Sequence, residues 1–372
     1  MARKFGKKNK IKLDVFDYNI GLIGESGIGK TTLAKEVCEK LVGEEGYMIL
    51  NIGRESGIDA IPGAVYEDVP DWRTFEEIVD DIIENRNTDY KDLKVLVYDT
   101  FDELMRITEP EVVRLHNKEY PPEKRVKTIN AAFGGFQRGE EKAIELVLDK
   151  IWQLKNIGIS MFIIGHTKRR TLDDPVTGQQ YDLLTTNMLT KYFNAIKTKL
   201  HVLGVASVNR AIEREFIQQK TGKNKIINKV VDESRIITFR DDNFRIDSKS
   251  RFEEIVPQIP FDPDEFIKAI QDAIKVAYEK QHNKKSFDEE KKEQELSKEE
   301  YIKQAVEEAK ANRINIYKNE ELIEIIKDKF MKASDETKNE IANIMKEYKF
   351  KDFKDPEEIP TEALEKIVEL LN

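Results

Sequence analysis

A run of eight residues near the amino terminus has the spacing of a phosphate-binding loop. Residues 24–31 read Gly-Glu-Ser-Gly-Ile-Gly-Lys-Thr, a pattern that cradles nucleotide phosphates. Glycine lets the backbone amides approach an anion and supplies positive φ. We expect Lys30 to reach the β and γ phosphates and the Thr31 hydroxyl to ligate Mg²⁺. The predicted ATP contacts are Gly24, Glu25, Ser26, Gly27, Ile28, Gly29, Lys30, Thr31 and Thr32.

Asp99 is the second candidate for the chemistry of this loop. It follows the apolar run Val95-Leu96-Val97-Tyr98, so it should lie at the carboxyl end of a strand beside the loop. A carboxylate there holds Mg²⁺ through water, as the Walker B aspartate does. A helix-capping aspartate is the alternative. The sequence therefore predicts ATP and Mg²⁺ as cofactors, with Thr31 and Asp99 as the metal residues.

The elements around these residues alternate between short apolar strands and helices from residue 11 to 164, which predicts an α/β fold with a mostly parallel, twisted sheet. The loop should be followed by a helix over 30–42, because Leu33, Ala34, Val37 and Leu41 have helical spacing. Thr74 with Glu77 suggests a capping box for another helix. We expect a long loop from Phe101 to Glu140. The expected strands are 20–23, 48–52, 95–98, 159–164, 200–208 and 235–239.

The chain changes character after three prolines between Pro257 and Pro263. Beyond them, apolar residues recur at helical spacing, and Ser297 with Glu300 suggests a further capping box. We therefore predict two parts, an ATPase core over residues 1–260 and an all-helical C-terminal extension over 261–372.

Composition limits the class of protein. Of 372 residues, 39% are hydrophobic and 36% are charged, and no run approaches the roughly 20 apolar residues of a membrane span. The single cysteine, Cys38, cannot form an internal disulfide, which favours a reducing compartment. We expect a cytoplasmic protein that does not bind membranes. A net charge of -9 argues against a general nucleic-acid coat, although basic residues cluster locally.

Three further features are candidates for catalysis and DNA binding. Glu55 lies just beyond the strand ending at Ile52, where a carboxylate can orient the attacking water; an exposed loop glutamate is the alternative. His166 follows the fourth expected strand. A functional role at the nucleotide site and a purely structural role are equally consistent with this position. Lys168, Arg169 and Arg170 precede a polar stretch and Tyr181. Cations neutralise phosphate and aromatic rings stack on bases, so this segment is a candidate for single-stranded DNA, although a solvated β-hairpin has the same composition.

Lys249 and Arg251 follow the strand expected over 235–239. Cations at a subunit edge can enter a neighbour's ATP site and stabilise the charge of the transition state, as an arginine finger does. Ordinary surface cations are the commoner explanation of such a run.

Five segments in this order resemble the phage RecA-like ATPases of the Sak group. They are Gly-Glu-Ser-Gly-Ile-Gly-Lys-Thr-Thr, Asn-Ile-Gly-Arg-Glu-Ser-Gly, Val-Leu-Val-Tyr-Asp-Thr, Ile-Ile-Gly-His-Thr-Lys and Ser-Lys-Ser-Arg-Phe. The resemblance covers residues 11–256, and its specific part is the phosphate-binding loop. It implies a RecA-like core, with Glu55 as catalytic glutamate, His166 as γ-phosphate sensor, and Lys249 with Arg251 as cations between subunits. Ser250 departs from the asparagine expected in the last motif, and the helical tail is additional.

The resulting hypothesis is an Mg²⁺-dependent ATPase that assembles on single-stranded DNA in phage recombination or annealing. It would form a homo-oligomer with ATP sites between subunits and act with single-strand binding protein or another replication or recombination protein. One alternative is a ring-shaped replication motor or helicase loader. The other is an ATP-gated switch that binds proteins and does not act on DNA.

Overall fold

The computed structural model describes residues 9–53, 57–173, 177–218, 224–241, 246–281, 285–330, 333–356 and 359–371. It divides into two compact units, residues 1–300 and 301–372. The predicted boundary at residue 260 falls inside the first unit. Among the described residues, no helix has the length and apolar character needed to cross a membrane.

The first unit is built on a mostly parallel mixed sheet, which has ten strands in the described part of the chain, in the order β10-β8-β7-β1-β5-β4-β2-β3. β6 and β9 pair with β5 and β7 off this path. The strands β1, β2, β3, β4, β5 and β7 run parallel, while β6, β8, β9 and β10 pair antiparallel. Their bounds are β1 Ile20–Gly24, β2 Tyr47–Ile52, β3 Tyr66–Val69, β4 Val95–Asp99, β5 Ser160–Asp173, β6 Gln180–Thr186, β7 Val202–Gln218, β8 Asn224–Thr238, β9 Lys249–Ser250 and β10 Gln258–Pro260.

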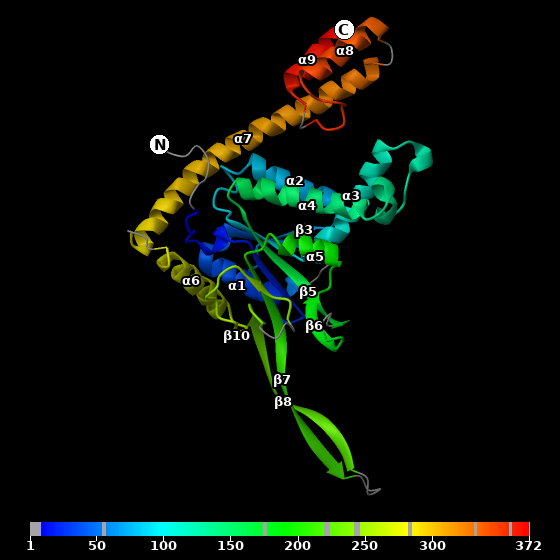
Figure 1. Cartoon of the computed structure of the whole chain (residues 1–372). Coiled ribbons are helices and arrows are strands. Elements are labelled where there is room, and N and C mark those ends of the chain that lie inside the picture. Colours follow the sequence, from blue (N-terminus) through cyan, green and yellow to red (C-terminus); the bar gives the residue numbers. More distant parts are fainter. Residues whose placement is uncertain are drawn as a thin grey trace. The chain divides into compact units, whose positions relative to one another are not determined.

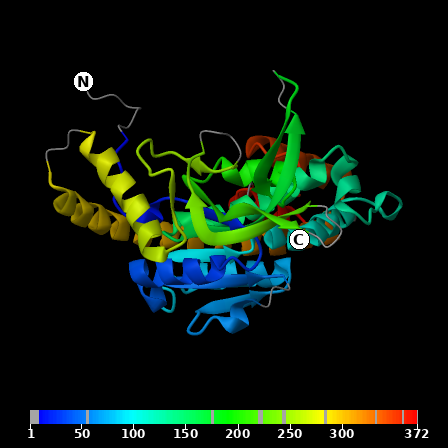
Figure 2. The same cartoon turned by 90° about the horizontal axis from the view of Figure 1, so that it is seen from below.

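Helices cover both faces of this sheet (Figures 1 and 2). On one face, α1 (Lys30–Val42) and α6 (Pro263–Glu279) share a hydrophobic core with alternate residues of the strands, such as Ile20 and Leu22 of β1. The other face carries α2 (Trp72–Glu84), α3 (Phe101–Glu119) and α4 (Arg138–Asn156). Alternation of this kind follows from the two-residue period of a strand. The short α5 (Thr190–Lys197) leads into β7.

The second unit is helical. It contains the later part of α7 (Phe287–Phe330), together with α8 (Asp335–Glu347) and α9 (Thr361–Leu370). Its own core is formed by buried residues that include Ile323, Ile341 and Leu364. The predicted fold class, α/β with a mostly parallel sheet and a helical C-terminal part, is confirmed.

Three local predictions were wrong. The segment 101–119 is helical, because buried Leu104, Met105, Thr108, Val112 and His116 lie at helical spacing despite Pro110. The cap of α2 is Asp71, whose carboxylate accepts the amide hydrogen of Thr74 at 2.9 Å. Ser297 lies inside α7, which starts instead with a reciprocal capping box between Ser286 and Glu289.

Candidate nucleotide site

The phosphate-binding loop connects β1 to α1 at the carboxyl edge of the parallel strands. Gly27 and Gly29 adopt positive φ, 77° and 102°, a backbone conformation that costs other residues energy. No side chain caps the amino end of α1, so its first amides face the loop. Lys30 is buried, and its ammonium donates to the carbonyl oxygens of Gly24 and Glu25 at 3.1 and 2.9 Å. The lysine is thus held inside the loop, where the chemistry of phosphate binding requires a cation.

Thr31 and Asp99 meet beside this loop. The Thr31 hydroxyl donates to Asp99 Oδ2 at 2.6 Å, and Asp99 is the last residue of β4 and is buried. A hydroxyl and a carboxylate are oxygen donors of the kind that Mg²⁺ binds, often with water and phosphate completing the shell. The residues present therefore fit the metal, and both metal residues expected from the sequence lie together.

His166 lies on the next strand, opposite the start of the loop. It pairs in register with Gly24, and its Nδ1 is 3.0 Å from Asp102 Oδ2 in the first turn of α3. The other oxygen of Asp102 is buried without a hydrogen-bond partner among the described residues. β5 continues past His166 to Asp173. One strand thus connects this histidine with the hairpin beyond it.

Glu55 lies outside the described residues. A different carboxylate occupies the end of β2, because a Cβ atom built on Gly53 would come within 2.6 Å of Glu103 Oε2. Glu103 lies in the first turn of α3 and forms an ion pair with Arg106 at 3.1 Å. It is therefore a second carboxylate near the position expected for a water-orienting glutamate.

Arg235 is a residue that the sequence reasoning missed. It lies on β8, and its Nη1 donates to the carbonyl oxygen of Ile28 within the loop at 3.0 Å. The guanidinium lies 5.3 Å from the ring centroid of Phe261, and a Cβ atom on Gly29 would come within 3.4 Å of Nη1. No motif in the sequence predicts this contact. The sheet order alone places a guanidinium and an aromatic ring against the loop.

We expect Arg235→Gln to weaken ATP binding about tenfold, because a cation bonded to the loop attracts the triphosphate through charge-assisted interactions. Equilibrium binding of ATP to the variant measures this effect. Arg240→Gln is the matched control, since Arg240 follows the same strand and donates instead to the carbonyl oxygen of Phe252 at 3.1 Å. Equal affinities in the two variants would contradict a role for Arg235.

The three cations predicted to contact DNA lie on a β-hairpin formed by β5 and β6. Lys168 and Arg169 are exposed. Arg170 is tied down, since its guanidinium donates to Thr190 Oγ1 at 2.9 Å and to the carbonyl oxygen of Met188 at 3.1 Å. Tyr181 pairs directly with Leu172, and both are partly exposed. Lys168 donates to the carbonyl oxygen of Asn187 at 3.3 Å, and Arg169 is 3.9 Å from Asp182. The hairpin thus presents two exposed cations and an aromatic ring, and DNA binding stays a prediction.

Lys249 and Arg251 lie at the amino ends of the parallel strands, opposite the phosphate-binding loop. β9 pairs with Val202 and Leu203 at the start of β7, whereas the loop follows the far end of β1. The side chains donate to the carbonyl oxygens of Lys197 and Thr198, at 2.6 and 2.7 Å. Burial and the charge of Arg251 lower the pKa of Lys249. Neither cation is placed to reach the phosphate-binding loop of its own chain.

Comparison with protein families bears on this geometry. A family model described as an AAA domain matches residues 17–252, more than half of the chain, and includes the loop, Asp99, His166 and Arg251. The chain belongs to this AAA domain family. None of the curated proteins matches the sequence. An AAA domain supports nucleotide-dependent ATPase activity and implies nucleotide binding, usually with Mg²⁺.

Proposed function

We propose that the protein is an Mg²⁺-dependent ATP hydrolase whose activity is coupled to single-stranded DNA, as in phage recombination or annealing by RecA-like ATPases of the Sak group. The observation that carries the proposal is the continuous strand β5. It brings His166 beside the start of the phosphate-binding loop and then extends into the hairpin that presents Lys168 and Arg169.

The geometry supports the roles proposed here for the described residues, and the role of Glu55 rests on the sequence alone. Lys30 stabilises the charge of the phosphates, while Thr31 and Asp99 hold Mg²⁺, which neutralises charge on the transferring phosphoryl group when bound. Glu55 or Glu103 orients the attacking water. His166, held by Asp102 at 3.0 Å, responds to the γ-phosphate.

Assembly is part of the same proposal. Lys249 and Arg251 lie away from the loop of their own chain, at the sheet edge where β9 pairs with β7. A cation placed there is too far from the loop nucleotide of its own chain but can reach the loop nucleotide of another subunit, as trans-acting arginine residues do. This supports a homo-oligomer in which neighbouring chains complete each other's ATP sites, with single-strand binding protein or another replication protein as partner.

A coupled readout of ATP hydrolysis and DNA binding tests the proposal. We expect single-stranded DNA to stimulate hydrolysis, and the double substitution of Lys168 and Arg169 by alanine to abolish the stimulation. The same variant should lower the slope of log affinity against log salt by about 1.4, because each phosphate contact on a single strand contributes about 0.7. Lys94→Ala, an exposed lysine beside the amino end of β4, is the matched control.

Hydrolysis that is indifferent to single-stranded DNA would reject the coupling. It would favour an ATP-gated switch that binds proteins. Translocation along DNA by stable rings would instead favour a replication motor or helicase loader.

A further inference from the structure

A cavity of about 580 Å³ lies at the amino edge of the parallel strands, away from the phosphate-binding loop. Tyr18 precedes β1, His201 precedes β7, and Lys155 is in the last turn of α4. All three line the cavity. Because β1 has five residues, its two ends are roughly 15 Å apart. The cavity is therefore a separate site, and its volume is in the range usual for small-molecule ligands.

The carboxylates that line this cavity contact two lysines. Asp17 forms an ion pair with Lys298 at 2.7 Å. Glu254 and Glu253 form ion pairs with Lys280 at 2.5 and 3.8 Å. Because Lys280 balances only one of its two glutamates, these groups leave one negative charge, on the largely exposed Glu253.

Three lining cations have no such counterpart. Lys12, Lys155 and Arg251 form no ion pair with a carboxylate among the described residues. The Lys155 ammonium donates to Asn19 Oδ1 and lies 5.9 Å from the ring centroid of Trp152. Lys155 is partly buried, and a partly buried charge costs free energy unless an opposite charge approaches. The cavity thus has an excess of positive charge that an anion would balance.

His201 adds a hydrogen-bond donor to this set. Its Nδ1 accepts the amide hydrogen of Asn19 at 2.9 Å, so in the neutral ring the proton is on Nε2. Burial and the positive charges of Lys155, Arg251, Lys249 and Lys12 lower the pKa of His201 to about 4. The histidine is therefore neutral at physiological pH, where its Nε2–H can donate a hydrogen bond.

Aromatic rings supply an apolar surface next to these donors. The Tyr18 ring packs edge-to-face against Phe252 and His201, with centroids 4.9 and 5.2 Å apart. Such rings can contact the face or edge of a base. Cations for phosphate and rings for a base are the combination that recognises a nucleotide.

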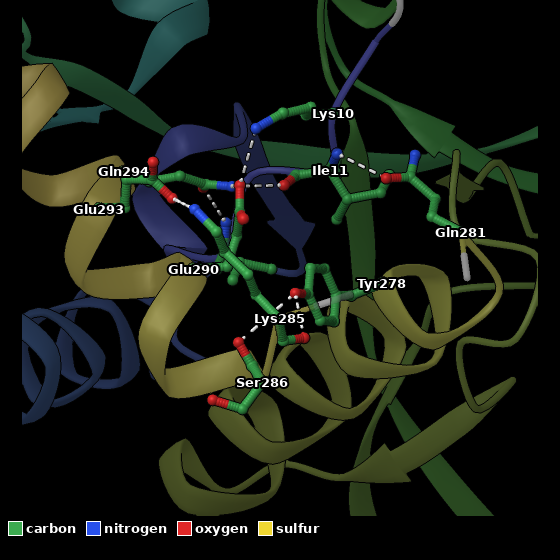
Figure 3. A network of polar contacts seen from close by, with 10 residues as sticks. Lys10, Ile11, Tyr278, Gln281, Lys285, Ser286, Glu290, Glu293 and Gln294 are labelled. Atoms are coloured by element: carbon green, nitrogen blue, oxygen red, sulfur yellow. Dashed lines mark hydrogen bonds and ion pairs between the residues drawn. The ribbon is translucent and has the colours of Figure 1, made fainter. Parts of the chain in front are cut away.

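The segment that forms one wall of the cavity is fixed in place (Figure 3). Lys10 pairs with Glu290 at 3.2 Å. The backbone of Ile11 bonds to Gln281 and Gln294, at 3.3 and 3.0 Å. These contacts hold residues 10–12 against α6 and α7, so the wall is part of the folded structure.

We propose that this cavity binds a second nucleotide through its phosphates, at the edge of the sheet opposite the phosphate-binding loop. Lys12, Lys155 and Arg251 bind the phosphates, His201 Nε2–H donates to them, and Tyr18 contacts the base. The proposal does not depend on hydrolysis at the loop.

The stoichiometry of ATP binding tests the proposal on the full chain. Equilibrium dialysis should give about two ATP per chain in the wild type and about one in Lys155→Met, which keeps the apolar stem but removes the charge. Lys142→Ala, on the same helix and ion-paired with Glu145, should still bind about two. Lys30→Ala removes the loop site, so ATP remaining in that variant should compete with pyrophosphate and be lost when Lys155→Met is added.

Three outcomes would overturn the proposal. They are one ATP per wild-type chain, unchanged binding in Lys155→Met, and a second ATP bound only when sedimentation shows assembled chains, since that nucleotide would belong to a neighbour. Lys12→Ala guards against a folding defect in Lys155→Met. Lys12 is exposed, so its replacement should not disturb the fold. Its loss should lower the affinity of the second site for ATP severalfold, because one charge-assisted contact is removed.

A pH profile separates a direct role of Lys155 from a structural one. Burial and the charges of Lys12 and Lys298 lower the pKa of Lys155 to about 8, opposed by Asp17. The other charged and titratable groups that line the cavity are Arg251, neutral His201, Tyr18, and the ion-paired Lys10, Glu253, Glu254 and Lys280. Affinity at the second site should be full below pH 8 and fall about tenfold as pH rises through 8 toward 10. A flat profile over this range would contradict the assignment.

Discussion

Lys30→Ala should lower ATP hydrolysis at least about 100-fold, because it removes the cation that stabilises charge developing on the phosphates. Lys30 is buried and donates to two carbonyl oxygens of the loop. Only modest rearrangement is needed for the same ammonium to turn toward a bound phosphate. Steady-state phosphate release, with and without single-stranded DNA, measures the loss.

Lys40→Ala is the control for this substitution. Lys40 is on the same helix and forms an exposed ion pair with Asp264 at 2.8 Å, a contact that contributes little to stability. The rate of ATP hydrolysis by Lys40→Ala should equal that of the wild type. If Lys30→Ala retained most of its activity, the loop would bind nucleotide without supporting hydrolysis, and the proposed function would lose its catalytic part.

Phe266→Ala should lower the free energy of unfolding of the first unit by about 3–5 kcal/mol, the usual cost of deleting a buried phenyl ring. Phe266 of α6 is fully buried. Its ring is stacked on Phe162 of β5, with centroids 6.1 Å apart, and is 5.6 Å from Phe239. Urea denaturation, followed by far-ultraviolet circular dichroism, measures the change in the free energy of unfolding.

Leu296→Ala is the matched control, since Leu296 is exposed on α7 and its loss should cost less than about 0.5 kcal/mol. A similarly small effect in Phe266→Ala would mean that α6 is dispensable. The core would then end near residue 260, as the prolines suggest. A large effect would extend the folding unit of the sheet through α6.

Local patterns in the sequence determined much of the parallel sheet. Apolar runs marked β1, β2 and β4 to within one residue, because strands buried on both faces read as continuous apolar segments. The glycine and lysine spacing located the loop, since its backbone needs residues of those types. Helix starts were less certain. Patterns such as Thr74 with Glu77 are short and frequent, and the true caps, Asp71 and Ser286, compete with them nearby.

The full length of the longer strands could not be predicted from such patterns. β5 continues through His166 and its basic residues to Asp173 because β6 pairs with it, and a polar strand is stabilised by its partner and not by its own composition. α3 was missed because Pro110 and the prolines after it signal a loop, while its buried face becomes evident only against α4 and β5.

The sequence by itself located the phosphate-binding loop, placed Asp99 at the end of a strand and determined the fold class, because each is marked by a short local pattern of residues. Only the tertiary structure decided which distant groups meet. It placed Arg235 on the loop, Glu103 at the end of β2, and Lys155 with His201 and Arg251 around one cavity. The physical reason is that strand order and register fix these neighbours, and that information is spread over contacts between residues far apart in sequence.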